Sequence, residues 1–92
     1  MDNDKFIQLC KQQVVEYIFE HNIEFMEDVG NGITTNDVYV VWLNRTLQNN
    51  KALLSTTIED GMYYEVTYNG DKDELYFDAY KHVHNEAIEL GD

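Results

Sequence analysis

The sequence predicts an α+β fold, with one N-terminal amphipathic helix packed on a four-stranded antiparallel sheet in a single domain of residues 1–92. Three observations support this prediction. Apolar residues recur every three or four positions in the N-terminal segment, which is helical spacing. Four later segments are rich in β-branched and aromatic residues, as strands are. Short breaks containing Asn, Asp and Gly separate these segments, and short connections favour antiparallel pairing.

The predicted helix follows Asp2, Asn3 and Asp4, which are good N-cap residues and suit the positive end of the helix dipole. It ends at about His21 or Glu24. One face carries the apolar residues Phe6, Leu9, Cys10, Val14, Tyr17 and Ile18. The thiol on this face is therefore expected to be buried and inert. Residues 24–36 mix acidic residues with glycines, which indicates a loop.

The four predicted strands are Asp37–Leu43, Lys51–Ile58, Met62–Tyr68 and Glu74–Ala79. Strict alternation places Val38, Val40 and Trp42 on one face of the first strand and Tyr39, Val41 and Leu43 on the other. Because both faces are apolar, we interpret this strand as a central one. The helix is expected to cover the side of the sheet that is richer in aliphatic residues.

The opposite side of the predicted sheet combines tyrosines with carboxylates. Its members are Tyr63, Glu65, Thr67, Tyr76, Asp78 and Tyr80. Tyrosine brings contact area with a polar tip, so this composition suits a protein-binding surface. Ordinary cross-strand pairing on a solvated face explains the same pattern. Both interpretations remain open at this point.

Residues 81–90 fit either a short C-terminal helix, which we favour, or a bent continuation of the last strand. Within them, His82, His84 and Glu86 combine two imidazoles with a carboxylate, which suits zinc. The spacing is far less specific than a paired-cysteine or HExxH motif. Surface histidines in an acidic neighbourhood are the competing explanation.

The chain is strongly acidic, with 18 Asp and Glu residues against 6 Lys and Arg and a formal charge of -12. This charge disfavours direct binding of nucleic acid and of anionic membranes. It favours a basic protein or a cation, although high net charge also serves solubility. Asp71 and Asp73, before the last strand, belong to the candidate partner-binding carboxylates. With Glu74 they also resemble calcium ligands, but the EF-hand spacing is missing.

The sequence predicts that the protein is not an enzyme. Its only serine, Ser55, lies in a predicted strand without the glycines of a nucleophile elbow. Its one cysteine is expected to be buried. The N-terminus lacks the features of a signal peptide, and no apolar run reaches the roughly 18 residues that span a bilayer. We therefore expect a cytoplasmic protein.

Residues 46–57, 60–71 and 74–81, together with Asp4–Ile7 and Val40–Trp42, resemble a family of small phage and prophage proteins. The family occurs in low-GC Gram-positive bacteria and is described as a domain of unknown function. The resemblance implies a phage accessory protein that acts in the cytoplasm of an infected bacterial host. It supplies no catalytic residues.

Phage origin gives the negative charge a concrete interpretation, because small acidic phage proteins often inhibit host nucleases by occupying basic channels. The hypothesis is an anti-CRISPR-type inhibitor of a host defence nuclease such as Cas9, whose guide and target channels are basic. The expected partner-binding residues are Glu65, Asp78, Tyr63, Tyr76, Tyr80, Asp71 and Asp73. The alternatives are a small zinc-binding structural protein and a regulator of phage replication or assembly that acts by protein–protein binding.

Overall fold

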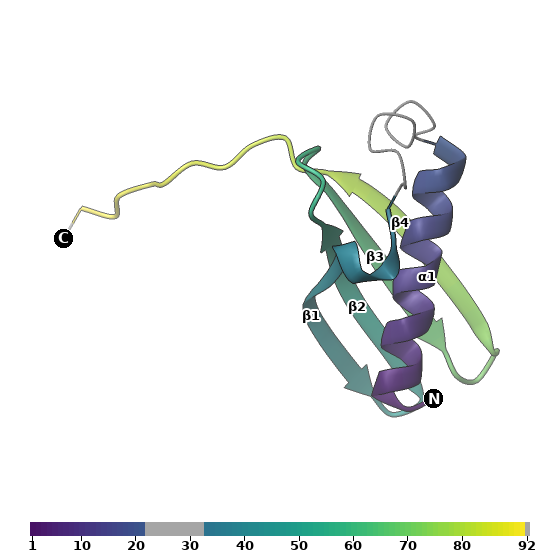
Figure 1. Cartoon of the computed structure of the whole chain (residues 1–92). Helices are drawn as coiled ribbons and strands as arrows, with labels where there is room; N and C mark the ends of the chain where they lie inside the picture. Colours follow the sequence, from purple (N-terminus) through teal and green to yellow (C-terminus); the bar gives the residue numbers. More distant parts are fainter. Residues whose placement is uncertain (22–32, 92) are drawn as a thin grey trace.

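The structure, a computed structural model, describes residues 1–21 and 33–91 and has the predicted α+β architecture (Figure 1). Helix α1 (Asn3–His21) lies across one face of a four-stranded antiparallel sheet. The other elements are the 3-10 helix η1 (Thr35–Asp37) and the strands β1 (Val38–Thr46), β2 (Asn49–Thr56), β3 (Met62–Asn69) and β4 (Glu74–Lys81). The strand order is β1-β2-β3-β4, so each strand pairs with its neighbour in sequence. Most of the loop predicted at residues 24–36 lies outside the described residues.

Helix α1 is amphipathic, as predicted. Asp2 caps it: its Oδ1 accepts a hydrogen bond from Lys5 N at 2.8 Å, and a carboxylate suits this end of the helix dipole. The buried residues Phe6, Cys10, Val14 and Ile18 repeat every four positions and form one stripe against the sheet. No helix among the described residues is long and apolar enough to cross a bilayer.

The face of the sheet that meets α1 supplies the other half of the core. Its buried residues are Val38, Ala52, Leu54, Tyr64 and Val66, with Val40, Leu43, Leu75 and Phe77 packed around them. The ring of Tyr17 in α1 lies 5.7 Å from the ring of Tyr64 and 5.5 Å from that of Phe77. These contacts close a two-layer core between the helix and the sheet.

Because of a β-bulge in β1, the prediction of which side chains share a face is wrong for the second half of this strand. The pairing with β2 shifts between Val40 and Trp42, so Val41 is an extra residue. An extra residue inverts the alternation of the side chains beyond it. Trp42 therefore faces away from Val38 and Val40, while Leu43 packs against the core. The strand is also an edge strand rather than the central one that its two apolar faces indicated.

The turn between β1 and β2 is shorter than predicted. It consists of residues 47–48, since Thr46 already pairs with Asn49. Asn50, which the sequence placed in the turn, is a buried residue of β2. Its side-chain amide donates a hydrogen bond to Asn3 Oδ1 of the helix at 3.4 Å. A tertiary contact thus holds a typical turn residue in a strand.

The favoured C-terminal helix is absent from the structure. Strand β4 continues past the predicted end to Lys81, which pairs with Met62. Residues 82–91, which we call the tail, form no helix or strand and extend away from the sheet (Figure 1). Val83, Ile88 and Leu90 are 87%, 73% and 92% exposed. Short helices need packing to be stable, and the apolar residues of the tail have no core to pack against.

Gly70, between β3 and β4, supports a close contact between two turns. A Cβ at this position would overlap the carbonyl oxygen of Gln48 and lie 2.8 Å from its Cβ. We expect Gly70→Ala to force the turns apart and to lower the free energy of unfolding by about 1–3 kcal/mol, measured by urea unfolding. Gly91→Ala is the control, since no atom lies within 4 Å of its added Cβ and its positive φ of 74° lies in the exposed tail, outside the packed fold. Equal stability of both variants would refute this packing role.

Two titratable side chains lie in the core. Burial raises the pKa of the Cys10 thiol from 9.0 to about 12. Burial, with smaller effects of Asp60 and Tyr17, raises the pKa of Tyr64 from 10.0 to about 12. The hydroxyl group of Tyr64 has no hydrogen-bond partner among the described residues. The core therefore favours the protonated form of both groups.

The raised pKa of Tyr64 predicts a loss of stability at high pH. Between 10.0 and about 12 the unfolded chain releases this proton while the folded chain keeps it, so stability falls as pH rises. We expect Tyr64→Phe to lose less stability than the wild type on going from about pH 9 to about pH 11, measured by urea unfolding. Tyr80→Phe, on the opposite face of the sheet, is the control. An unchanged pH dependence in Tyr64→Phe would contradict this assignment.

Candidate functional site

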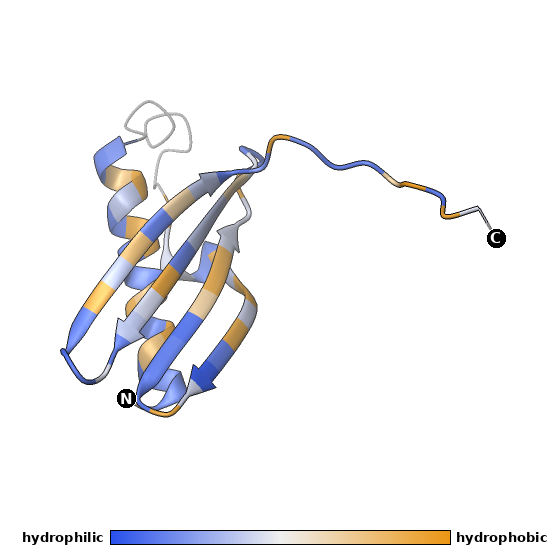
Figure 2. Ribbon diagram, turned by 180° about the vertical axis from the view of Figure 1, so that it is seen from behind, coloured by the Kyte–Doolittle hydropathy of each residue, from blue (hydrophilic) through white to orange (hydrophobic). Residues whose placement is uncertain are grey.

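The side of the sheet opposite α1 is not covered by any described element, and we call it the open face (Figure 2). The strand register places these side chains on it: Tyr39, Trp42, Lys51, Leu53, Tyr63, Glu65, Thr67, Tyr76, Asp78 and Tyr80. Its aromatic residues Tyr39, Trp42, Tyr76 and Tyr80 are between 41% and 51% exposed. Exposed surfaces this rich in aromatic residues are typical of protein-binding sites.

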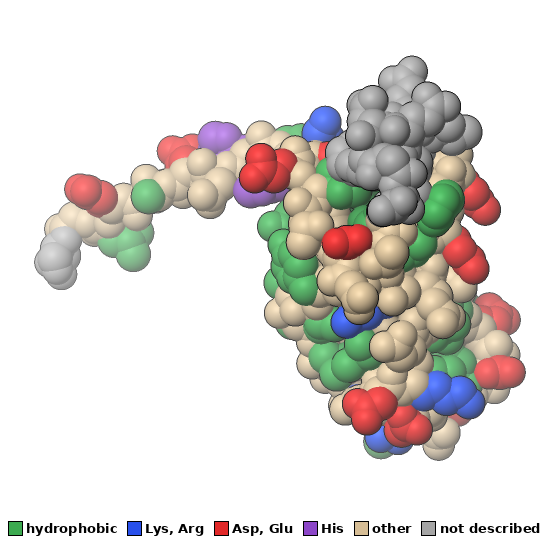
Figure 3. Space-filling model, in the orientation of Figure 1, with side chains coloured by type: hydrophobic (Ala, Val, Ile, Leu, Met, Phe, Trp, Pro, Cys, Tyr) green, Lys and Arg blue, Asp and Glu red, His purple; other side chains and the backbone are tan. Residues whose placement is uncertain are grey.

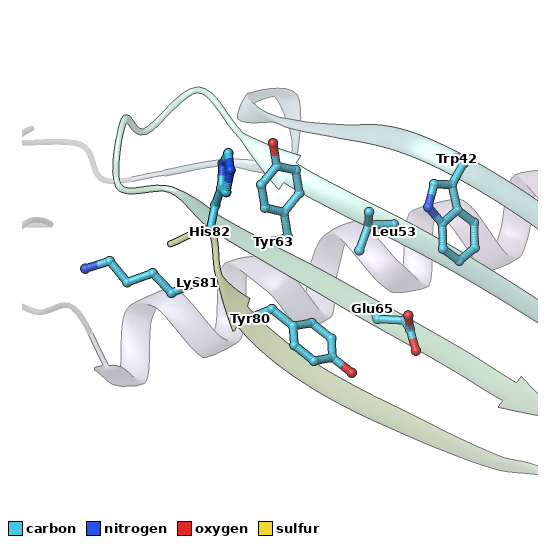
Figure 4. Close-up of a pocket in the computed structure, with 7 residues that line it drawn as sticks. All are labelled: Trp42, Leu53, Tyr63, Glu65, Tyr80, Lys81 and His82. Atoms are coloured by element: carbon cyan, nitrogen blue, oxygen red, sulfur yellow. The ribbon is translucent and has the colours of Figure 1, made fainter. Parts of the chain in front are cut away.

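A shallow depression of about 390 Å³ lies on the open face (Figure 4). Its lining residues are Trp42, Leu53, Tyr63, Glu65 and Tyr80, with Lys81 and His82 at one end. Leu53 of β2 pairs with Trp42 on one side and with Glu65 on the other, while Tyr63 pairs with Tyr80. The depression thus brings together three aromatic residues from β1, β3 and β4, and Leu53 lies between Trp42 and Tyr63. The side chain of Lys81 points away from them.

The open face also holds a like-charge pair. Glu65 of β3 and Asp78 of β4 lie directly opposite each other. Lys51 of β2 partly offsets this repulsion, since its Nζ lies 3.2 Å from Glu65 Oε1. The side chains of Lys51 and Glu65 are 46% and 22% exposed. Surface ion pairs typically contribute less than about 1 kcal/mol, and the partial burial of Glu65 reduces the screening of this one by solvent.

A comparison of the sequence with models of known protein families assigns the chain to a family. The sequence model of a family of unknown function, DUF6275, matches residues 7–90, which include most of α1, the whole sheet and most of the tail. The chain belongs to the DUF6275 family. No curated protein and no solved structure matches the chain significantly. The match confirms the family of unknown function inferred from the sequence, while phage origin stays a prediction.

In this DUF6275 chain, five of the predicted partner-binding residues lie together on the open face: Tyr63, Glu65, Tyr76, Asp78 and Tyr80. Their role in binding stays a prediction. Trp42 and Leu53 were not among the predicted residues. Nothing in the alternation of β1 revealed the bulge that turns Trp42 outward, and a leucine next to another leucine in a strand carries no functional signal. Only the register brings these two residues to the depression.

Asp71 and Asp73 lie in the turn between β3 and β4, at one end of the sheet and apart from the depression. Asp73 Oδ1 accepts a hydrogen bond from Tyr68 OH at 2.7 Å, and this bond raises the pKa of Tyr68. The neighbouring Glu74 accepts one from Tyr76 OH at 2.8 Å, which likewise raises the pKa of Tyr76. These carboxylates therefore order the end of the sheet and contribute negative charge at its edge.

The predicted zinc ligands lie at the start of the tail. His84 Nε2 lies 2.8 Å from Glu86 Oε1, whereas His82 Nε2 lies 2.9 Å from the backbone oxygen of His84. The ring of His82 rests against that of Tyr63 at 6.2 Å. Among residues 1–21 and 33–91, no three His, Cys, Asp or Glu side chains form a group that could hold a metal. The zinc site of this DUF6275 protein stays a prediction.

The zinc hypothesis predicts that tag-free protein binds Zn²⁺ in isothermal titration calorimetry. His84→Gln should abolish this binding, and His21→Gln, at the end of α1, should preserve it. Because the hypothesis is a structural zinc, the metal should bind the folded protein preferentially, and removal by a chelator should lower the melting temperature. Wild-type protein that takes up no Zn²⁺ would rule the hypothesis out.

Proposed function

We propose that this protein is a non-catalytic binding protein that contacts a basic host protein through the open face. The most concrete candidate is a host defence nuclease such as Cas9, which would make the protein an anti-CRISPR-type inhibitor. In this proposal the protein is a phage accessory protein that acts in the cytoplasm of an infected bacterial host. The observation that supports it best is the half-exposed aromatic surface of the open face on a chain of charge -12.

The aromatic residues of the open face would supply the short-range contact. Tyr and Trp bury large areas at low entropic cost and dominate many interfaces. Tyr39, Trp42, Tyr76 and Tyr80 are each close to half exposed, so a partner could remove much of their surface from water. The sheet beneath them is held by three antiparallel hydrogen-bonded pairings, so the surface is preorganised and loses little freedom on binding.

The carboxylates are spread over several elements rather than gathered in one acidic patch. They would therefore attract a basic partner at long range. Figure 3 shows Asp and Glu side chains on the tail, along the helix side and at the end of the sheet. Such a distribution raises the rate of encounter with a basic surface, and its effect falls steeply with ionic strength. Glu65 and Asp78 are the carboxylates that would enter the contact itself.

Size-exclusion chromatography with a Cas9-type nuclease tests the proposal. We expect a complex at low ionic strength that weakens as salt increases. Asp78→Lys should weaken binding roughly tenfold, because it reverses a charge inside the contact. This variant should remain folded, since it turns a like-charge pair with Glu65 into an opposite-charge pair.

Glu16→Lys is the matched control, because it makes the same change in charge on the exposed side of α1. Equal effects of the two substitutions would show that the open face is not the contact. If no nuclease forms a complex even at low salt, the inhibitor proposal fails. A pull-down that recovers phage replication or assembly proteins instead would support the regulator that the sequence also allows.

A further inference from the structure

We propose that the depression on the open face binds an arginine side chain presented by the basic partner. This inference rests on the proposed function and specifies the chemistry by which the open face would recognise its partner. Three features of the same residues support it: aromatic rings around the depression, an apolar floor, and two carboxylates on adjacent strands.

The aromatic rings provide the first feature. Trp42, Tyr63 and Tyr80 surround the depression from three different strands (Figure 4). A cation over the face of such a ring is attracted by its quadrupole, most strongly over Trp. Leu53 forms the floor between the rings and suits the aliphatic stem of a long cationic side chain. The depression thus matches both the charged head and the apolar stem of such a side chain.

The carboxylates provide the third feature. Glu65 lines the depression, and Asp78 of β4, just outside the lining, lies directly opposite Glu65. Like charges directly opposite each other destabilise a sheet. A bound cation would relieve this repulsion, so the pair gains stability when the site is filled. Lys51 engages Glu65 Oε1 at 3.2 Å, but a carboxylate can accept several hydrogen bonds and keeps capacity for a second donor.

Arginine fits these features better than lysine. Its planar guanidinium can stack on an aromatic ring and donate two parallel hydrogen bonds to one carboxylate. It is also less strongly hydrated than an ammonium group, so the cost of entering an apolar depression is lower. The positive groups nearby do not block the site: Lys51 is held by Glu65, and the side chain of Lys81 points away from the rings.

A partner carrying negative charge would be repelled by Glu65 and Asp78. A purely apolar partner would cover two carboxylates that share the single positive charge of Lys51, which is costly. Charge complementarity therefore selects a basic protein segment, and the depression marks the place where one of its arginines would be buried.

The single tryptophan of the chain lies in the depression, so its fluorescence reports binding directly. The probe is a capped Gly-Ser-Arg-Ser-Gly peptide, compared with the same peptide carrying lysine or the neutral isostere citrulline. We expect the arginine peptide to change Trp42 emission saturably. The lysine peptide should bind more weakly, and citrulline should give no saturable change.

Two pairs of variants test whether the arginine peptide binds at the depression or is attracted only by the negative charge of the whole protein. Tyr80→Leu should weaken arginine binding roughly fivefold by removing a ring, whereas Tyr80→Phe should preserve it. Glu65→Gln should weaken it about fivefold or more, while Glu16→Gln, which removes the same charge from α1, should have little effect. Tyr80 is 51% exposed on an edge strand, so its variants should fold, as circular dichroism will verify.

If Glu65→Gln and Glu16→Gln lose equal affinity for the arginine peptide, the inference is overturned, because the peptide is then attracted only by diffuse negative charge. Equal binding of citrulline would show a merely apolar groove, and equal binding of lysine would overturn the preference for arginine. The test is independent of the nuclease experiment. Peptide binding without a nuclease complex would refute the proposed function alone, whereas a nuclease complex unaffected by Tyr80→Leu would refute the arginine site alone.

Discussion

The structure depends on the packing of one apolar stripe of α1 against one face of the sheet. Phe6, Cys10, Val14 and Ile18 meet strands whose inward side chains include Tyr64 and Val66, and these residues make up most of the buried core. A sheet has two faces, and α1 covers only one of them. The other face is therefore presented to solvent by a scaffold that its own core already stabilises. This division explains how a chain of 92 residues can hold one face of its sheet open on a stable scaffold.

The bulge at Val41 decides what that surface contains. Without the extra residue, Trp42 would point into the core and Leu43 would be exposed. With it, Leu43 packs against the core, and the indole of Trp42 lines the same depression as Tyr63 of β3 and Tyr80 of β4. Bulges are common near functional sites because they redirect a side chain without disturbing the rest of a strand. The depression on the open face is a direct product of this one irregularity.

In the proposed function, the carboxylates and the aromatic surface have separate roles. Most carboxylates of the described residues lie on the helix, the turns and the tail, where they would act at a distance and be screened by salt. Glu65 and Asp78 differ, because they lie side by side among aromatic residues at some cost in stability. Features that break a local stability rule often mark functional positions. These two residues place part of the negative charge of the chain at one defined position on the open face.

The sequence by itself determined the fold class, α1, the four strands and five of the residues on the open face, because helical and strand periodicities are local properties of the chain. Tertiary structure decided the features that depend on contacts between strands. These are the bulge that turns Trp42 outward, the edge position of β1, the place of the buried Asn50 in β2, and the extended tail. The depression belongs to the same class, since its residues come from all four strands. Alternation along one strand shows which residues share a face, but only the register between strands shows which of them meet.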